Sequence, residues 1–310
     1  MSDTQQGLAP DCLQRVLRSR FRQQVKPGVR RIAGTIRPEL GDGGRSLRRG
    51  EDRMPYVDNG GVRIHYEVEG RGPALVLHHG FTQNLRRWHL AGYVDALRND
   101  YELVLIDARG HGTSDKPHEP TAYALATRVG DVVAVLDDVK RDTAAFWGYS
   151  MGGRIGFGLA KYARGRITAF VIGGQHPYEV RLPESSRLDG TDPEAFVAAL
   201  YQRLNVNPAT LPAAIREDLL ANDFRALAAA QQDQPSLEDV LPRMTMPCLL
   251  YAGDVDPYYS GAQKCAKRIP NARFFSLQGL DHGAAFREAG LVVPHVTEFL
   301  QSVTRNAVKS

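Results

Sequence analysis

Six short, predominantly apolar runs are the feature that most restricts what this chain can fold into. They are bounded by glycine or aspartate, as is typical of parallel strands covered on both faces. Helical patterns occupy 122–139, 155–162 and 293–303, between or after the runs. This alternation predicts an α/β fold with a mostly parallel sheet and helices on both faces. The runs are Ala74–Leu77, Leu103–Ile106, Ala144–Trp147, Thr168–Ile172, Cys248–Tyr251 and Phe274–Leu277.

A seventh strand is expected ahead of these runs. Apolar residues alternate with polar ones over 62–68, which is the pattern of a half-buried strand. Asn59-Gly60 is a hairpin turn signal and pairs this strand with residues 55–58. The alternation places His65 on the solvent face.

The alternation of strands and helices is interrupted between Ile172 and Cys248. Two helix-like segments, 193–204 and 211–231, replace the expected strand. We therefore predict a helical lid over 179–245, inserted into a core formed by 54–178 and 246–310. The lid would lie over one end of the sheet.

The first 53 residues differ in composition from the rest. They carry 12 Lys and Arg against 6 Asp and Glu, a net charge of +6, whereas residues 54–310 have a net charge of −2. Arg, Gln and Gly are frequent there, and no apolar stretch resembles a signal peptide. We expect a disordered basic extension, because such a composition buries little apolar surface. A basic arm that contacts nucleic acid or anionic lipid is the alternative.

Composition also restricts which binding partners and which cellular location we expect for this protein. Its slightly acidic balance gives no reason to expect nucleic acid, and no apolar run approaches the length of a membrane span. The three cysteines, Cys12, Cys248 and Cys265, form no CxxC pair or disulfide framework. This usage favours a cytoplasmic protein. No oligomeric state is predicted.

The pentapeptide Gly148-Tyr149-Ser150-Met151-Gly152 carries the strongest chemical signal. It follows an apolar strand and opens a helical pattern. A turn this sharp strains the backbone of Ser150 and exposes its hydroxyl, and the flanking glycines let the chain pass close by. Ser150 is therefore the candidate nucleophile.

A serine needs a base to take its proton and an acid to orient that base. His282 follows the last apolar run, where a loop would overhang the carboxyl edge of the sheet. Asp256 follows the penultimate run and is the preferred acid, with Asp254 as the alternative. Asp281 adjoins the histidine, but neighbouring side chains diverge. The chain order Ser, Asp, His then supports a triad of Ser150, Asp256 and His282.

Acyl transfer also needs two N–H donors for the oxyanion. The backbone N–H of Met151, directly after the nucleophile, is one candidate. The N–H of Phe81 is the second, because Gly80 lets the loop after Ala74–Leu77 turn inward. We expect His79 to brace this loop.

In combination these motifs resemble the α/β-hydrolase family. The segments HHGF, DARGHGTSD, GYSMGG, GDVD and GLDH occur in the family's order and span about residues 55–305. They look most like the esterase, enol-lactonase and cofactor-free haloperoxidase branch. The resemblance implies a serine hydrolase that uses no metal and no organic cofactor. It also implies that Arg109 and Ser114 belong to a structural loop.

A narrower resemblance concerns HGFTQ and the segment Tyr149–Arg154. It is similar to the enzyme of menaquinone synthesis that eliminates pyruvate to form 2-succinyl-6-hydroxy-2,4-cyclohexadiene-1-carboxylate. In that family the matching arginine binds a substrate carboxylate and the serine acts as a base. This resemblance makes Arg154, together with Tyr149, a candidate substrate-binding residue.

The sequence therefore predicts a serine esterase or lactonase that acts on a small molecule. Aromatic residues of the lid and of the loop after Tyr251 are expected to form the walls of an apolar pocket. The alternatives are the pyruvate-eliminating lyase and a non-catalytic small-molecule receptor on the same fold. The expected wall residues are Tyr178, Phe196, Tyr201, Phe224 and Tyr258.

Overall fold

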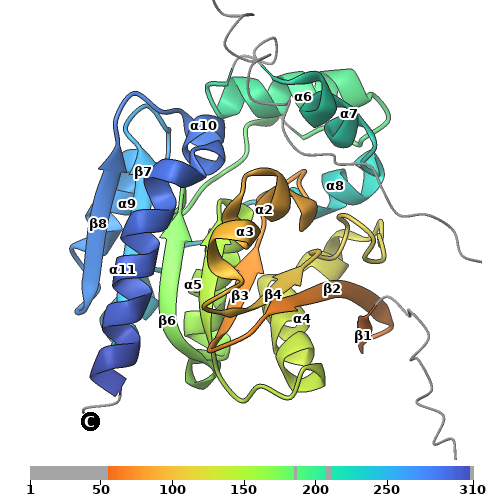
Figure 1. Ribbon diagram of the computed structural model, residues 1–310. Helices are drawn as coiled ribbons and strands as arrows, with labels where there is room; N and C mark the ends of the chain where they lie inside the picture. The colour runs from red at the N-terminus through yellow and green to blue at the C-terminus, as the bar shows by residue number, and fades with distance from the viewer. Residues whose placement is uncertain (1–54, 185–186, 207–210, 308–310) are drawn as a thin grey trace, which may run out of the picture. The chain divides into compact units, whose positions relative to one another are not determined.

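An eight-stranded sheet forms the centre of the computed structural model, which describes residues 55–184, 187–206 and 211–307 (Figure 1). The predicted extension 1–53 lies outside the described residues. The strand order is β1-β2-β4-β3-β5-β6-β7-β8. The strands are β1 Tyr56–Asn59, β2 Val62–Gly70, β3 Ala74–His78, β4 Glu102–Ile106, β5 Ala144–Tyr149, β6 Ile167–Gly173, β7 Cys248–Gly253 and β8 Ala272–Leu277.

Six of the eight strands run parallel, as the apolar runs predict. β1 and β2 form the predicted hairpin, and β2 pairs antiparallel with β4. All other neighbours pair in parallel. Each predicted run is a strand, which confirms the predicted fold class.

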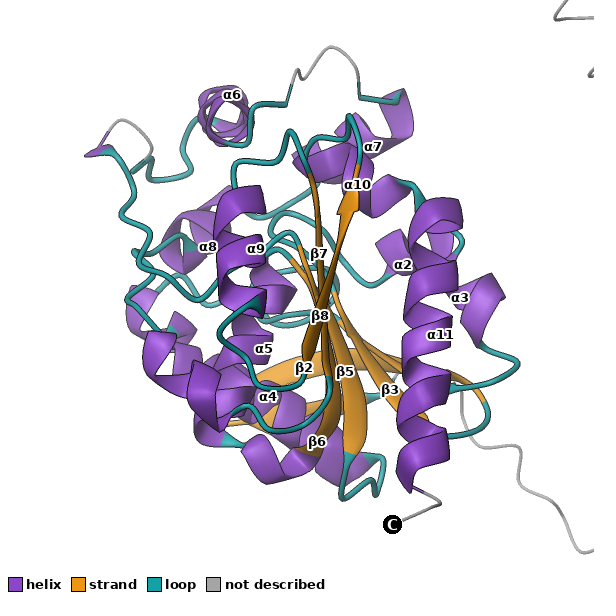
Figure 2. Ribbon diagram, turned by 90° about the vertical axis from the view of Figure 1, so that its left-hand side faces the viewer, coloured by secondary structure: helices purple, strands orange, loops and turns teal. Residues whose placement is uncertain are grey.

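Helices cover both faces of the sheet (Figure 2). One buried cluster joins the sheet to α4, α5 and α9, and a second joins the opposite face to α2, α3, α10 and α11. The predicted helices at 122–139, 155–162 and 293–303 correspond to α4, α5 and α11. The helices of the two layers are α2 Arg86–Leu90, α3 Tyr93–Leu97, α4 Leu125–Asp138, α5 Met151–Tyr162, α9 Tyr259–Ala266, α10 His282–Arg287 and α11 Ala289–Ala307.

The segment between β6 and β7 is helical, as expected, and lies over one end of the sheet (Figure 1). It contains α6 Pro193–Arg203, α7 Ala213–Leu220 and α8 Phe224–Ala230. The single helix expected over 211–231 is thus two helices. The break falls where Asp223 caps α8, because its carboxylate accepts a hydrogen bond from the Ala226 N–H at 3.0 Å.

His65 is buried, so the prediction that it faces solvent is wrong. Its Nδ1 lies 2.9 Å from Oδ2 of Asp107, and its side chain is only 3% exposed. Val68, at the far end of the same strand, is 44% exposed. Ile64 and Tyr66 are buried as the alternation predicts, and the opposite face at His65 is also covered, because the loop that carries Asp107 packs over it.

The loop after β4 is held by buried charges. Asp107 accepts hydrogen bonds from the backbone N–H groups of Leu85 and Thr113. Arg109 forms a two-point ion pair with Asp131 of α4, at 2.7 and 2.5 Å, and both side chains are almost fully buried. This is the structural role that the family resemblance implies for Arg109.

Replacing Asp131 with Ala leaves the Arg109 guanidinium buried without its carboxylate. We expect the free energy of unfolding to fall by about 3–5 kcal/mol, as for other broken buried ion pairs. Urea denaturation measures the change. Asp95→Ala is the matched control, because Asp95 pairs with Arg98 on the surface and should change stability little. Equal effects of the two variants would contradict the assigned role of the buried pair.

Candidate active site

Ser150 occupies a strained turn between β5 and α5. Its backbone has φ 53° and ψ −112°, which a residue with a side chain rarely adopts. The neighbouring glycines make this turn possible. A Cβ on Gly148 would lie 2.3 Å from the Gly152 backbone, and a Cβ on Gly152 would lie 2.2 Å from the His78 carbonyl oxygen. The turn therefore requires both glycines of the motif.

His282 is the first residue of α10 and is held from two sides. The Asp281 carboxylate caps this helix by accepting a hydrogen bond from the Ala284 N–H at 2.7 Å. The Tyr149 hydroxyl donates to the His282 carbonyl oxygen at 2.6 Å. The residue before the serine therefore fixes the backbone of the histidine.

Ser150, His282 and Asp256 form a continuous chain of hydrogen bonds. The His282 Nε2 lies 2.9 Å from the Ser150 Oγ, and its Nδ1 lies 2.8 Å from the Asp256 Oδ2. The other oxygen of Asp256 accepts from the Tyr258 N–H at 2.8 Å. Asp254, the alternative acid, instead accepts from the Gly279 N–H at 2.7 Å. The structure thus brings together the three residues that the sequence selects.

The hydrogen-bond pattern fixes the position of the imidazole proton. An ionised carboxylate only accepts hydrogen bonds, so Nδ1 of His282 carries the proton toward Asp256. Nε2 is then an acceptor facing the Ser150 hydroxyl. This is the arrangement that allows a serine to transfer its proton to histidine as it attacks a carbonyl carbon.

Two backbone N–H groups beside Ser150 are open to a ligand. In the described part of the chain, neither the Phe81 N–H nor the Met151 N–H donates to a protein acceptor. The loop that carries Phe81 passes close to the serine, since a Cβ on Gly80 would lie 3.4 Å from the Ser150 Cβ. Both residues, and Gly80 with them, line the cavity described below.

His79 braces this loop from below, as expected. Its Nδ1 lies 2.8 Å from the Gly80 carbonyl oxygen, and its Nε2 accepts from the Ala108 N–H at 3.0 Å. Only a neutral imidazole protonated at Nδ1 makes both bonds. Burial lowers the pKa of His79 below its usual range and so keeps it neutral.

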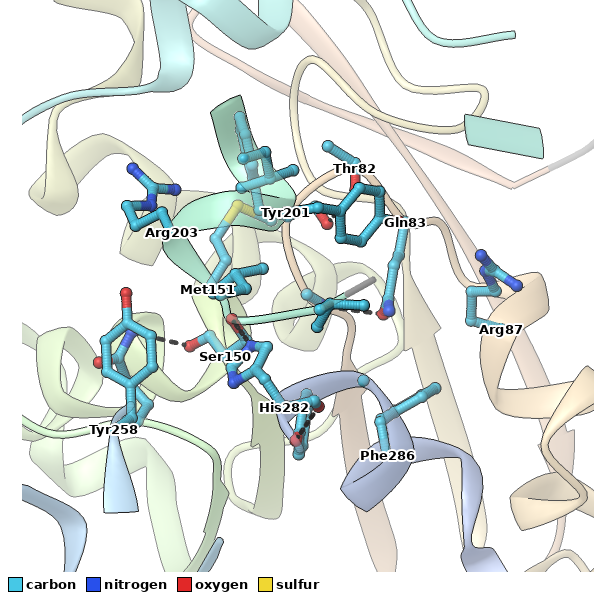
Figure 3. A pocket seen from close by; sticks show the side chains of 18 of the residues that line it. Thr82, Gln83, Arg87, Ser150, Met151, Tyr201, Arg203, Tyr258, His282 and Phe286 are labelled. Atoms are coloured by element: carbon cyan, nitrogen blue, oxygen red, sulfur yellow. Dashed lines mark hydrogen bonds between the residues drawn. The ribbon is translucent and has the colours of Figure 1, made fainter. Parts of the chain in front are cut away.

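A cavity of about 360 Å³ opens at Ser150 and His282 (Figure 3). Tyr149 and Tyr258 line it, as predicted, although the hydroxyl of Tyr149 is already bonded to His282. Tyr201 lines it too. Phe196 and Phe224 instead pack against each other in the core of the insertion, with ring centroids 5.5 Å apart.

Tyr178 is not among the lining residues, which corrects the prediction that it forms a wall of the pocket. Its ring lies under the Lys264 ammonium group, 4.6 Å from the centroid, and 5.3 Å from the ring of His176. It packs against the core beside α9 rather than facing Ser150.

Arg154 is also not among the lining residues, so the prediction of a substrate carboxylate on this arginine is not supported by its position. Its side chain is buried, and its guanidinium donates to the carbonyl oxygens of Pro177 and Pro235. Burial lowers the pKa of Arg154 to about 10. The arginine ties the chain on both sides of α6, α7 and α8, at Pro177 and Pro235, to α5.

Several polar residues that line the cavity are not predicted from the sequence. Gln83 accepts from the Gly80 N–H at 3.2 Å, and its place in the HGFTQ segment was the one available signal. Four arginines on four different elements or loops also line the cavity, and no pattern in the sequence connects them. They are Arg87, Arg128, Arg203 and Arg287.

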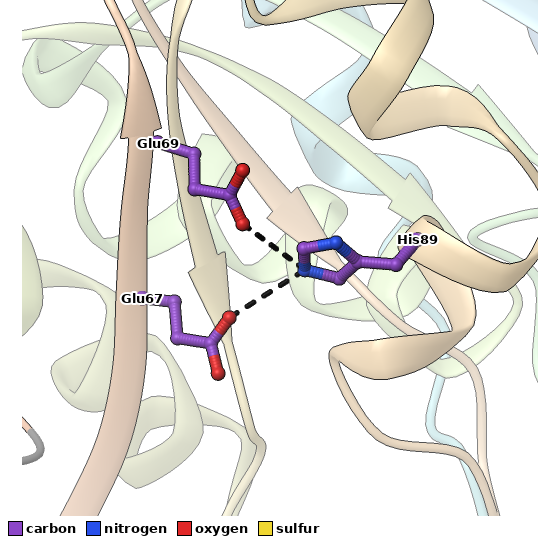
Figure 4. Close-up of side chains that lie close together, drawn as sticks. All are labelled: Glu67, Glu69 and His89. Atoms are coloured by element: carbon purple, nitrogen blue, oxygen red, sulfur yellow. Dashed lines mark ion pairs between the residues drawn. The ribbon is translucent and has the colours of Figure 1, made fainter. Parts of the chain in front are cut away.

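One group of side chains outside this cavity has the composition of a metal site. The Nε2 of His89, on α2, lies 3.5 Å from Glu67 and 3.4 Å from Glu69 of β2 (Figure 4). Each side chain is about one-third exposed, and Arg98 also approaches Glu69 at 3.8 Å. None of the three lines the Ser150 cavity, so the group takes no part in its chemistry.

Comparison with known proteins agrees with this geometry. The family model for the alpha/beta hydrolase fold matches residues 73–289. The chain therefore belongs to the alpha/beta hydrolase family and is a hydrolase-class enzyme. None of the described helices is long and apolar enough to cross a membrane.

Similar proteins differ in their activity. The enol-lactonase from Burkholderia xenovorans LB400 is 26% identical with a TM-score of 0.68, and the match covers 80% of this chain and 100% of that one. An esterase from Rhodococcus sp. ECU1013 is 26% identical with a TM-score of 0.68, over 80% and 98% of the two chains. A Bacillus subtilis (strain 168) protein, provisionally named 2-succinyl-6-hydroxy-2,4-cyclohexadiene-1-carboxylate synthase, is 27% identical over 77% of this chain and 96% of its own length.

Replacing Gly152 with Ala should damage the turn at Ser150. The added Cβ meets the His78 carbonyl oxygen at 2.2 Å, so backbone must move. We expect a loss of stability of about 1–3 kcal/mol and slow labelling of Ser150 by a fluorophosphonate, both measured on purified protein. Gly165→Ala is the control, because a Cβ there meets nothing within 4 Å. Normal labelling of the Gly152 variant would contradict this account of the turn.

Acid should destabilise the loop that His79 braces. The pKa of His79 is lowered in the folded protein. The stability that neutral His79 contributes is therefore fully present above about pH 6.5, the ordinary pKa of histidine. Below that pH the unfolded chain binds a proton that folded His79 does not. Urea denaturation between about pH 7 and 5 should show stability falling by up to about 1.4 kcal/mol per pH unit per such histidine. The slope should be smaller in His79→Gln, and an unchanged slope would count against the assignment.

Proposed function

We propose that this enzyme hydrolyses an ester or lactone of a small molecule, with Ser150 as nucleophile, His282 as general base and Asp256 as the acid that orients it. The observation that carries the proposal is the unbroken hydrogen-bond chain from Asp256 through His282 to Ser150, at 2.8 and 2.9 Å, on the wall of a cavity. The enol-lactonase and esterase among the similar structures support the same chemistry.

The first half of the reaction acylates Ser150. His282 Nε2 takes the hydroxyl proton as Oγ attacks the carbonyl carbon. The carbonyl oxygen becomes an oxyanion, which the N–H groups of Phe81 and Met151 stabilise. The bond to the leaving oxygen then breaks, and His282 gives its proton to that oxygen.

The second half repeats these steps with water. His282 removes a proton from a water molecule, whose oxygen attacks the acyl carbon. The bond to Oγ breaks, and the proton returns from His282 to Ser150. The products are a carboxylic acid and the free enzyme, and every step uses protein groups and water alone.

We also propose that residues 179–245 form a lid over this site. Leu200, Tyr201 and Leu204, from α6 and the residue after it, line the cavity together with Tyr258. Apolar and aromatic side chains on an inserted segment would admit the substrate and keep bulk water from the acyl-enzyme. Residues of the lid would then set substrate size.

Labelling with a fluorophosphonate, read by intact mass, is the first test of the proposal. We expect one adduct on Ser150 and turnover of short-chain p-nitrophenyl esters. Ser150→Ala should lose both, and Asp256→Asn should lose turnover by about 10⁴-fold, as in other triads with a misoriented histidine. Asp254→Asn is the matched control and should retain turnover, because the Asp254 carboxylate accepts from the Gly279 N–H and, among the described residues, makes no contact with His282. Well-folded protein with neither adduct nor turnover would overturn the esterase proposal.

The pyruvate-eliminating lyase is the second candidate. The specific observation in its favour is the match to the Bacillus subtilis protein over nearly its full length. The position of Arg154 counts against it, since its guanidinium is bonded to two backbone carbonyls. Pyruvate release from the corresponding cyclohexene substrate, in protein that hydrolyses no ester, would establish it.

A further inference from the structure

The charge lining the cavity is one-sided. Arg87, Arg128, Arg203 and Arg287 contribute guanidinium groups to its wall, and no aspartate or glutamate is among its described lining residues. The surrounding core does not share this bias, because residues 54–310 have a net charge of −2. The positive charge is therefore concentrated at the site where a ligand would bind.

Two of the four arginines lie away from the other pair, and one of them, Arg128, already has a local role. Arg128 donates to the Ala230 carbonyl oxygen at 2.7 Å and lies over the ring of Tyr123, 5.3 Å from the centroid. Arg203 lies on the side of the cavity that Tyr258 occupies (Figure 3). Both side chains are partly buried, and the hydrogen bond of Arg128 joins α4 to the last residue of α8 in the insertion.

Arg87 and Arg287 form a separate pair at another part of the cavity wall. Arg87 is on α2 and Arg287 ends α10, the helix that His282 begins. Both side chains are half-buried, and in the described part of the chain neither forms an ion pair with a carboxylate. Each guanidinium lies within the electrostatic reach of the other and of the Tyr201 hydroxyl.

This pairing has an electrostatic cost that a ligand can remove. Burial lowers the pKa of Arg87, opposed by the negative charge of Asp218 and reinforced by the positive charge of Arg287. The Asp218 carboxylate forms no ion pair with Arg87 or Arg287 in the described part of the chain, so these two adjacent, partly desolvated cations favour the binding of an anion. A guanidinium fork matches a carboxylate in two-point geometry, which makes a carboxylate the fitting ligand.

We propose that the substrate carries a carboxylate in addition to its ester or lactone, and that Arg87 and Arg287 bind this carboxylate while Ser150 attacks the carbonyl. The inference rests on the proposed hydrolase function and names its substrate class. Five residues separate Arg287 from His282 along α10, a rise of roughly 8 Å. Because His282 contacts Ser150 and Arg287 lies at the other end of α10, we expect a spacer between the carboxylate and the carbonyl that reacts.

Matched ester pairs test this directly, because members of a pair differ only in a carboxylate that replaces a methyl group. Monomethyl adipate with methyl hexanoate places the carboxylate on the acyl side. 4-Acetoxybutanoate with butyl acetate places it on the alcohol side. Alcohol release is followed by proton NMR, and kcat/KM is compared within each pair. We expect the anionic member of at least one pair to be preferred by about tenfold or more, as charge-assisted contacts in a partly buried site imply.

Variants then assign the preference to the two arginines. Arg87→Gln and Arg287→Gln should each reduce the anionic-to-neutral ratio of kcat/KM by about tenfold. Arg86→Gln is the matched control, because Arg86 is exposed on the same short helix and does not line this cavity. It should leave the ratio unchanged. Labelling of Ser150 by a neutral fluorophosphonate verifies that each variant retains its folded site.

The outcomes separate this inference from the proposed function. Equal or better turnover of the neutral members, in protein whose Ser150 is labelled, overturns the carboxylate site and leaves the hydrolase intact. Absence of labelling and of all turnover overturns both. The wild-type ratio should also fall with added salt, since salt screens partly exposed charges. A ratio that salt and both variants leave unchanged would falsify the assignment to Arg87 and Arg287.

Discussion

The backbone conformation of Ser150 is the constraint on which the rest of the site depends. A residue with a side chain holds φ 53° here because the elements on both sides of the turn are fixed: β5 pairs with β3, and α5 packs against β5 and β6. Gly148 and Gly152 allow that packing, since a side chain at either position would strike backbone. The hydroxyl then lies where the loops after β3, β7 and β8 converge, and each of these loops supplies one of the other groups. The strain is local, and the parallel sheet is what sustains it.

The three loops are held by different kinds of contact. The loop after β3 relies on a neutral, buried His79, whereas the loop after β7 is fixed by the hydrogen bond from the Tyr258 N–H to Asp256. The loop after β8 is held by the capping of α10 by Asp281 and by the Tyr149 hydroxyl. The histidine is thus positioned from the serine's own strand. A change in the position of β5 would therefore move Ser150 and His282 together.

Most of the fold and the three central residues could be predicted from the sequence, because both depend on local patterns. Continuous apolar runs reveal buried parallel strands, and the glycine spacing around Ser150 reveals the turn. The predictions are wrong where a residue distant in the sequence determines the position of a side chain. His65 is buried because the loop that carries Asp107 covers it, and Arg154 is not among the lining residues of the cavity because its guanidinium bonds to the carbonyl oxygens of two prolines. The arginines of the cavity wall come from segments up to two hundred residues apart, so only the folded chain brings them together.

Arg154 has a consequence for how this enzyme can change over time. Its guanidinium joins the carbonyl oxygens of Pro177 and Pro235, which lie on either side of α6, α7 and α8, to the helix that follows the nucleophile. The intervening chain is therefore a loop closed at its base, and its length and composition can vary while the attachment is unaltered. This attachment separates the evolution of the catalytic residues from the evolution of substrate selection. Ser150, His282 and Asp256 remain fixed in the hydrolase core, whereas the chain between Pro177 and Pro235 can change as new substrates are encountered.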